Sequence, residues 1–178
     1  MVDLFIKLIE ALWLILPAYF ANGLIPLAKG KHPIDFNKKF IDNQPLFGKG
    51  KTWEGFFLGC FVGFLIGSLQ WFIYDFISLK TSKLNLIKIN PLLGFLLGFG
   101  AVFGDLVGSF IKRRLKMPRG HPFPLLDQED FLLGSLFFVY WFIKIEIEWF
   151  LILLIITPII HLIANLIAYL TKIKKEPW

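Results

Sequence analysis

Four runs of apolar residues in this sequence are long enough to cross a lipid bilayer as helices. A membrane-spanning helix needs about 20 consecutive, mostly apolar residues. The runs cover residues 11–28, 56–74, 91–111 and 149–171, and only the third holds a charge, at Asp105. Hydrophobic residues make up 56% of the chain and charged residues only 18%, which is too apolar for an ordinary soluble domain. The sequence therefore predicts an all-α integral membrane protein.

A fifth apolar segment, residues 131–143, is uncharged but short, at about 20 Å of helix. It crosses the bilayer only if Lys144 extends its side chain to the far interface and the helix continues towards Ile147. We predict five transmembrane helices in a single polytopic domain that covers residues 1–178. The predicted spans are about 4–28, 53–75, 91–112, 130–147 and 149–171.

The distribution of positive charge predicts the orientation, because cytoplasmic loops are enriched in Lys and Arg. With five spans and the N-terminus outside, the inner side holds most of the 19 Lys and Arg. The inner cations are Lys29, Lys31, Lys38, Lys39, Lys49, Lys51, Lys112, Arg113, Arg114, Lys116, Arg119, Lys172, Lys174 and Lys175. The outer ones are Lys7, Lys80, Lys83, Lys88 and Lys144. We predict a multi-pass protein of the cell membrane with an outer N-terminus and a cytoplasmic C-terminus.

The polar chemistry is concentrated in two predicted cytoplasmic loops. Residues 29–51 and 112–130 carry most of the inner cations, and the outer loop at residues 75–90 has no catalytic spacing. The chain has no phosphate-binding P-loop and no nucleophilic Ser or Cys motif, and its one cysteine, Cys60, excludes an internal disulfide. We expect membrane lipid and small molecules as partners, and no nucleic acid.

Glycines recur at helical spacing in the second and third predicted spans. Small residues on one helix face allow close packing, here inside the bundle or across a homodimer. The second span carries Gly55, Gly59, Gly63 and Gly67, and the third carries Gly94, Gly98, Gly100, Gly104 and Gly108. Beside Gly104 and Gly108, a second interpretation is that the missing side chains leave room for a ligand.

Asp105 is a carboxylate inside a predicted span, where a charge is costly and marks a functional candidate. At about 100° per residue, Ser109 and Lys112 fall on the same stripe of the helix. The alternative is a structural contact of Asp105 with Lys112 or Ser109.

More carboxylates stand where the second inner loop re-enters the membrane, at Asp127, Glu129 and Asp130. Converging carboxylates repel one another unless a cation lies between them, and Mg²⁺ commonly uses one or two carboxylates together with substrate phosphates. Nearby cations would hold phosphate, namely Lys112, Arg113, Arg114, Lys116 and Arg119. This combination is typical of nucleotidyl or phosphoryl transfer.

These residues resemble a known family signature. Residues 104–113 (GDLVGSFIKR) and 126–130 (LDQED) are similar to the signature of the phosphatidate cytidylyltransferase, or CDP-diacylglycerol synthase, family. Residues 51–55 (KTWEG) are similar to a second marker of that family. Gln128 replaces the usual Arg, and the linker before it is short. Both departures match the compact archaeal branch, the CDP-archaeol synthases, whose pattern is present across residues 119–131.

The resemblance implies that CTP and an isoprenoid-ether glycerol phosphate react, with Mg²⁺, to give a CDP-lipid and pyrophosphate. The lipid phosphate attacks the α-phosphorus directly, so the reaction needs no protein nucleophile. The implied catalytic residues are Asp105, Asp127 and Lys112, and the implied Mg²⁺ ligands are Asp105, Asp127 and Asp130. The implied nucleotide site consists of Lys51, Thr52, Glu54, Ser109, Lys112, Arg113 and Arg114.

Several alternatives stay open on the sequence. Residues 51–54 also fit an ordinary helix start, with Thr52 as N-cap and Trp53 at the membrane interface. A CTP-dependent polyprenol kinase would use similar motifs but release CDP, and a small ion or phosphate carrier would use Asp105 as its coupling carboxylate. His161 and Asn165, four residues apart in the last span, are expected to hydrogen-bond within the bundle rather than catalyse.

Overall fold

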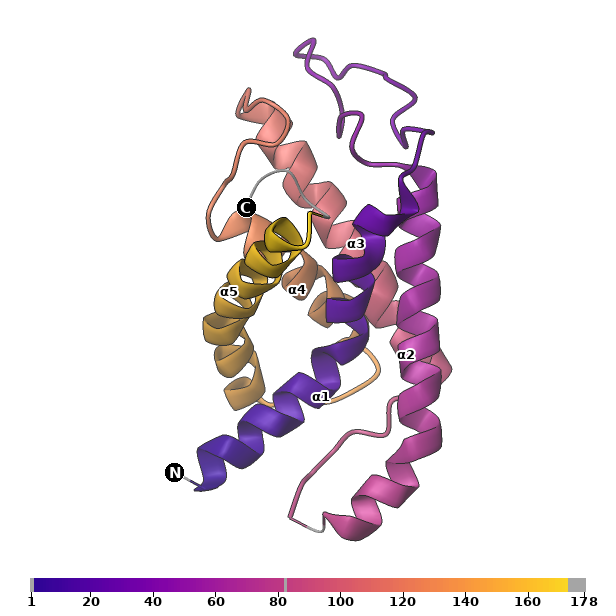
Figure 1. The fold of residues 1–178 in the computed structure, drawn as a ribbon, viewed down its shortest axis with the longest axis vertical. Coiled ribbons are helices and arrows are strands. Elements are labelled where there is room, and N and C mark those ends of the chain that lie inside the picture. Colours follow the sequence, from indigo (N-terminus) through magenta and orange to yellow (C-terminus); the bar gives the residue numbers. More distant parts are fainter. Residues whose placement is uncertain (1, 82, 173–178) are drawn as a thin grey trace.

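Helices make up most of the computed structural model, which describes residues 2–81 and 83–172 (Figure 1). Lys174 and Lys175, assigned above to the inner side, lie outside these residues. The elements of the described chain are α1 (Val2–Leu24), the 3₁₀ helix η1 (Ile25–Ala28), α2 (Trp53–Lys80), α3 (Pro91–Arg114), α4 (Leu126–Val139) and α5 (Ile147–Leu170).

Four helices of the described chain are long and apolar enough to cross a membrane: α1 with η1, α2, α3 and α5. The all-helical, multi-pass architecture predicted from the apolar runs is therefore confirmed. α4 has only 14 residues and does not reach this length, so the five-span count and the orientation stay predictions.

The ends of α4 differ from the predicted fourth span, residues 130–147. The helix begins earlier, at Leu126, because the side chains of Asp127 and Gln128 accept hydrogen bonds from the backbone of the preceding loop. It ends at Val139, and residues 140–146 form turns and coil instead of continuing the helix past Lys144.

α3 lies at the centre of the bundle, where it packs against α1, α2 and α4. The loops 29–52 and 115–125 lie at the end of the bundle opposite the N-terminus, at the top of Figure 1. Side chains from four helices fill the core without exposure to solvent, including Leu14, Leu97, Leu132 and Leu153. The topology thus brings both predicted functional loops to one end of the molecule.

Glycines allow the closest helix contacts, as the packing interpretation predicts. A Cβ added to Gly63 of α2 would lie 2.6 Å from the Cα of Gly98 of α3, which is nearer than real Cβ atoms come. The prediction of ligand space beside Gly104 and Gly108 is wrong, because Asp130 of α4 fills it with its backbone and its carboxylate. The glycine faces are therefore used inside the chain, and the homodimer stays a prediction.

Polar contacts close the N-terminal end of the bundle. Glu10 of α1 is buried and accepts hydrogen bonds from Trp149 Nε1 at 3.0 Å and from Asn85 N at 2.6 Å. Lys7 forms an ion pair with Glu146, just before α5. These contacts tie α1 to the α2–α3 connection and to α5.

Candidate active site

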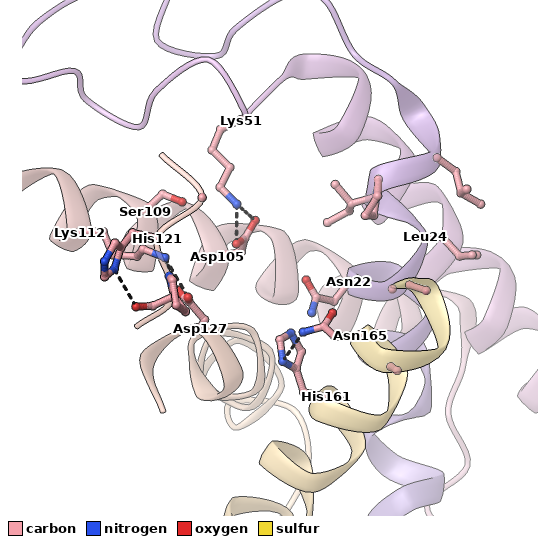
Figure 2. A pocket seen from close by; sticks show the side chains of 18 residues that line it. Asn22, Leu24, Lys51, Asp105, Ser109, Lys112, His121, Asp127, His161 and Asn165 are labelled. Atoms are coloured by element: carbon pink, nitrogen blue, oxygen red, sulfur yellow. Dashed lines mark hydrogen bonds and ion pairs between the residues drawn. The ribbon is translucent and has the colours of Figure 1, made fainter. Parts of the chain in front are cut away.

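A cavity of about 430 Å³ lies between the two functional loops and the helices below them (Figure 2). This volume is within the usual range for small-molecule sites. One part of its wall carries the charged and hydroxyl side chains Lys51, Asp105, Ser109, Lys112 and Asp127. The remaining wall comes from the end of α1, from η1 and from α5, with a further contribution from residues 120–122. Five segments of the chain therefore share one cavity.

Lys51 pairs with the intramembrane carboxylate Asp105. Its Nζ lies 2.5 Å from both carboxylate oxygens, and both side chains are about three-quarters buried. Asp105 stands nine residues before the end of α3, about 14 Å along the helix axis. The predicted alternative of a structural contact with Lys112 or Ser109 is wrong, since the charge of Asp105 is compensated by a lysine from the first loop.

Backbone pairing fixes the position of Lys51. The carbonyl of Lys51 accepts from Ile34 N at 2.9 Å, and the carbonyl of His32 accepts from Trp53 N at 2.9 Å. These bonds hold the strand-like segment around Lys51 against residues 32–34, directly above the start of α2. The lysine is therefore presented by a folded loop rather than by a freely moving one.

Thr52 and Glu54 support this loop instead of lining the cavity. Thr52 is the N-cap of α2, and its Oγ1 accepts from Gly55 N at 3.3 Å, which confirms the capping interpretation. The Glu54 carboxylate accepts from the backbone amides of Lys31 and His32 and pairs with His32 Nδ1 at 2.5 Å. Glu54 therefore holds residues 31–32 against the first turn of α2, and Thr52 caps that turn.

Asp35 organises the first loop, and the sequence analysis missed it. Its carboxylate is buried and accepts hydrogen bonds from the backbone amides of Asn37, Phe47 and Gly48. Gly48 has a φ of +93°, a conformation that favours glycine. The turn that precedes Lys51 is thus built by a buried carboxylate and a glycine.

Lys112 and Asp127 form the second ion pair of the cavity. Lys112 Nζ lies 2.8 Å from both oxygens of Asp127, and the lysine side chain is only 12% exposed. Asp127 also accepts from Phe123 N at 2.9 Å, in the first turn of α4, where a negative charge is favoured by the helix dipole. The pair joins the end of α3 to the start of α4.

The structure gives Arg113 and Arg114 other partners than the predicted phosphates, and neither lines the cavity. Arg113 donates to the carbonyl of Met117 at 2.6 Å, within the turn that follows α3. Arg114 donates to the carbonyl of Pro45 at 2.5 Å and pairs with Asp42 at 3.2 Å. Its guanidinium also lies over the rings of Phe40 and Phe110. Arg114 therefore clamps the first loop onto α3.

The predicted trio of Mg²⁺ ligands is only partly assembled. Asp105 and Asp127 line the cavity, whereas Asp130 packs behind them against Gly108. In the described part of the chain, no three His, Cys, Asp or Glu side chains are close enough to hold a metal ion. Because Mg²⁺ is commonly held by one or two carboxylates and by substrate phosphates, the donor chemistry of Asp105 and Asp127, which both border the cavity, fits this ion.

The cavity also contains polar residues that the sequence analysis did not assign to it: Asn22, His121, His161 and Asn165. His161 Nδ1 and Asn165 Nδ2 are 3.2 Å apart, so the predicted bond within the bundle is confirmed. The available signal was a polar pair at i and i+4 in an otherwise apolar helix. That pattern predicts that the two side chains lie on the same face of the helix. Only the packing of α5 shows that this face borders the cavity.

Comparisons of the sequence and of the structure with known proteins point to one family. A family model described as CarS-like CDP-archaeol synthase matches residues 1–178. The chain is 47% identical to a CDP-archaeol synthase of Pyrococcus abyssi, covering 95% of this chain and 97% of the relative. It is 42% identical to that of Methanocaldococcus jannaschii, covering 96% and 97%. A solved structure, described as an intramembrane enzyme for archaeal membrane lipid biosynthesis, aligns with a TM-score of 0.75 and 33% identity, over 89% of this chain and 94% of that one.

Proposed function

The chain belongs to the CDP-archaeol synthase family, whose members are CTP-dependent cytidylyltransferases, and from this premise we propose which residues carry the reaction and how the protein lies in the membrane. The family assignment excludes the two alternative functions, the polyprenol kinase and the carrier. The proposed substrates are CTP and 2,3-bis-O-geranylgeranyl-glycerol 1-phosphate, and the products are CDP-archaeol and pyrophosphate.

The reaction is a direct displacement at phosphorus. An oxygen of the lipid phosphate forms a bond to the α-phosphorus of CTP, while the bond from that phosphorus to the bridging oxygen breaks and pyrophosphate leaves. A phosphate monoester is already largely ionised at neutral pH, with a second pKa of about 6, so the attacking oxygen needs no general base. The protein therefore has to position two anionic substrates and to stabilise charge.

The observation that carries this proposal is the presence of two Lys–Asp pairs in one cavity. Lys51 with Asp105 and Lys112 with Asp127 come from three segments of the chain and face the same space. The ammonium groups would bind the phosphates of CTP, and the Ser109 hydroxyl would donate to a phosphate or ribose oxygen. Asp105, Asp127 and Lys112 are the proposed catalytic residues.

Asp105 and Asp127 would hold Mg²⁺, with Asp130 as the supporting carboxylate behind them. When bound, the metal ion would neutralise negative charge on the transferring and leaving phosphates. Both carboxylates have a lysine as counter-charge, and the phosphates of CTP offer each lysine another anionic partner. The four charged side chains can thus serve the metal and the nucleotide together.

The other residues that the family signature implies would act on the nucleotide site indirectly. Thr52 caps α2 directly after Lys51, and Glu54 holds the segment that pairs with it. Arg113 shapes the turn after α3, and Arg114 fastens the first loop. These four residues position the two lysines, and their substitution would change the site through its geometry.

The proposed topology places both loops and the C-terminus in the cytoplasm and the N-terminus outside the cell membrane. The clustering of the loops at one end of the bundle supports it, because CTP reaches them from the cytosol. α4 runs from the loop end back towards the start of α5 and would complete the fifth crossing. The cavity would then border both cytosol and lipid, as a reaction between a soluble and a lipid substrate requires.

Product analysis tests the function directly. Purified protein in detergent, given Mg²⁺, labelled CTP and the geranylgeranyl-ether glycerol phosphate, is expected to form CDP-lipid and pyrophosphate in equal amounts. Asp105→Asn should reduce kcat by at least about 100-fold, since it removes a charge from the reacting centre. Asp75→Asn is the matched control, because Asp75 pairs with Lys88 at the opposite end of the molecule and should leave kcat unchanged.

Two further measurements test the acceptor specificity and the metal requirement. Phosphatidic acid offered as acceptor reports whether ether-linked isoprenoid tails are required, and EDTA should abolish turnover until Mg²⁺ is restored. Release of CDP instead of pyrophosphate, or full activity of Asp105→Asn, would refute the proposed chemistry.

A further inference from the structure

The cavity has a second polar wall that the proposed reaction has not yet used. Asn22 of α1 and the pair His161 and Asn165 of α5 line it. Figure 2 shows these three side chains together, across the cavity from Lys112 and Asp127. Asn165 is only 6% exposed although it lines the cavity, so its amide has lost most of its contact with water. Removing a polar group from water costs free energy.

This wall lies deep in the membrane-spanning part of the protein. His161 stands nine residues before the end of α5, about 14 Å along the axis, which is the depth of Asp105 below the end of α3. Polar side chains at such depth usually face the bundle interior and mark substrate pathways. The Lys51–Asp105 pair and the second wall therefore line the same cavity from different helices.

The two walls differ in charge. The first carries ammonium and carboxylate groups, whereas the second offers two amides and an imidazole. Neutral donors suit a phosphate and a glycerol ether that approach the reacting centre beside the far more highly charged triphosphate. The second wall also belongs to α1 and α5 alone, so a group bound there is held by helices and not by the cytosolic loops.

Beside this wall the chain leaves room for an apolar tail. A Cβ added to Gly23 would find no heavy atom within 4 Å, and Ala164 of α5 also lines the cavity and is exposed. On the outer face of α5, four large apolar residues are each about half exposed and would contact lipid: Leu162, Ile163, Leu166 and Ile167. A chain that leaves the cavity past Gly23 and Ala164 thus reaches a hydrocarbon environment.

We propose that Asn22, His161 and Asn165 form the binding site for the phosphate and glycerol of the lipid acceptor, and that its tails leave between Gly23 and Ala164. This inference rests on the proposed function, because it divides the cavity between the two substrates of that reaction. The first wall then binds CTP, and the second wall holds the attacking phosphate in line with it.

Steady-state kinetics of the full-length protein in detergent test this division. Asn22→Ala and Asn165→Ala should each raise KM for the geranylgeranyl acceptor about tenfold, the effect of losing one hydrogen bond to a charged group. KM for CTP and the equilibrium binding of CTP with Mg²⁺ should stay within twofold of wild type. Leu162→Ala, on the lipid-facing side of α5, is the control and should change neither KM.

Gly23→Leu tests the path of the tails without removing a polar group. It should reduce turnover of the geranylgeranyl acceptor at least tenfold, but leave turnover of a dibutyl-ether glycerol phosphate close to wild type. Equal losses with both acceptors would overturn the proposed path.

The outcomes separate this inference from the function on which it rests. If wild type makes no CDP-lipid, the proposed function fails. If wild type is active and the Asn variants raise KM for CTP instead of the acceptor, the second wall binds nucleotide and the inference is overturned. If Asn165→Ala fails to fold, two other measurements test the inference. One is KM for the acceptor in His161→Gln, and the other is the turnover of the long-tailed and short-tailed acceptors by Gly23→Leu.

Discussion

Each lysine of the cavity pairs with an aspartate on another segment, and this pairing explains how a membrane helix tolerates a carboxylate. The charge of Asp105 is energetically unfavourable at its depth in the helix bundle unless a cation compensates it. Lys51, 54 residues earlier in the chain, provides that cation. The motif spacing identified both residues separately, but no local rule connects them. Their contact depends on the fold of the first loop above α3.

At the same scale, Arg114 shows how a signature residue can act as a clamp. Arg114→Lys keeps the positive charge but loses the planar guanidinium that reaches both Pro45 and Asp42. We expect faster hydrogen exchange in residues 36–47 of this variant. In a double-mutant cycle with Asp42→Asn, the coupling free energy of unfolding should be about 0.5–1 kcal/mol, a small value because both side chains are partly exposed.

The readout separates a clamp from a direct phosphate ligand. A direct phosphate ligand would show no coupling to Asp42 and no change of hydrogen exchange in the first loop. Additive effects of the two substitutions, with unchanged exchange in the first loop, would contradict the clamp.

At the scale of elements, glycines decide how α2, α3 and α4 fit together. Gly63 and Gly67 meet Gly94 and Gly98 backbone to backbone, so the α2–α3 contact has no space for side chains. The spacing predicted close packing because small residues at i and i+4 share a helix face. It did not identify the partner face, and the space beside Gly104 proved to be filled by α4.

Gly98→Ala is expected to destabilise the bundle. The added Cβ would lie 2.8 Å from the Cα of Gly63 and from the carbonyl oxygen of Gly59, so α2 and α3 must move apart. Overpacking of this kind costs about 1–3 kcal/mol. Thermal unfolding in detergent measures the loss, and Gly23→Ala, which adds a methyl group to open space on a helix, should not lower the midpoint.

The contact of Lys7 with Glu146 makes the stability of the α1–α5 junction depend on pH. The hydrogen bond from Lys7 holds the pKa of the Glu146 carboxyl below its usual value. A lowered folded-state pKa means that the contribution is fully present above the unfolded value, about 4.3, and is lost as pH falls through the folded value.

Glu146→Gln should therefore lower the unfolding midpoint at pH 6 by about 2 °C, a small effect because the pair is partly exposed. The difference from wild type should shrink as pH falls below about 4. Glu148→Gln is the control, since Glu148 is more exposed and lies 3.9 Å from Lys7. A deficit of Glu146→Gln that persists unchanged at pH 3 would contradict an ionic origin.

At the scale of the whole molecule, the bundle places all the assigned chemistry at one end. The loops 29–52 and 115–125 meet there, and the N-terminus lies at the other end (Figure 1). The topology proposed from the positive charges therefore makes a prediction about which residues face the cytosol.

Cysteine labelling tests that topology, because the sequence has only one cysteine, Cys60, and it is buried. In a Cys60→Ala background, Lys83→Cys should react with a membrane-impermeant thiol reagent in intact cells, whereas Lys38→Cys should react only after the cells are permeabilised. Both lysines are exposed, so access to the aqueous side is the variable that the experiment reports. The reverse pattern would show that the N-terminus is cytoplasmic.

The sequence by itself determined the helical membrane architecture, and it identified the two polar loops and the residues of both Lys–Asp pairs. These features follow from local properties: the length of an apolar run, the cost of a charge inside it and the spacing of a motif. Only the tertiary structure decided that Lys51 faces Asp105, that Arg114 holds Pro45, and that Asn22 and Asn165 share a wall of the cavity. Such contacts join segments far apart in the chain, and they are set by how whole helices pack, which no short stretch of sequence encodes.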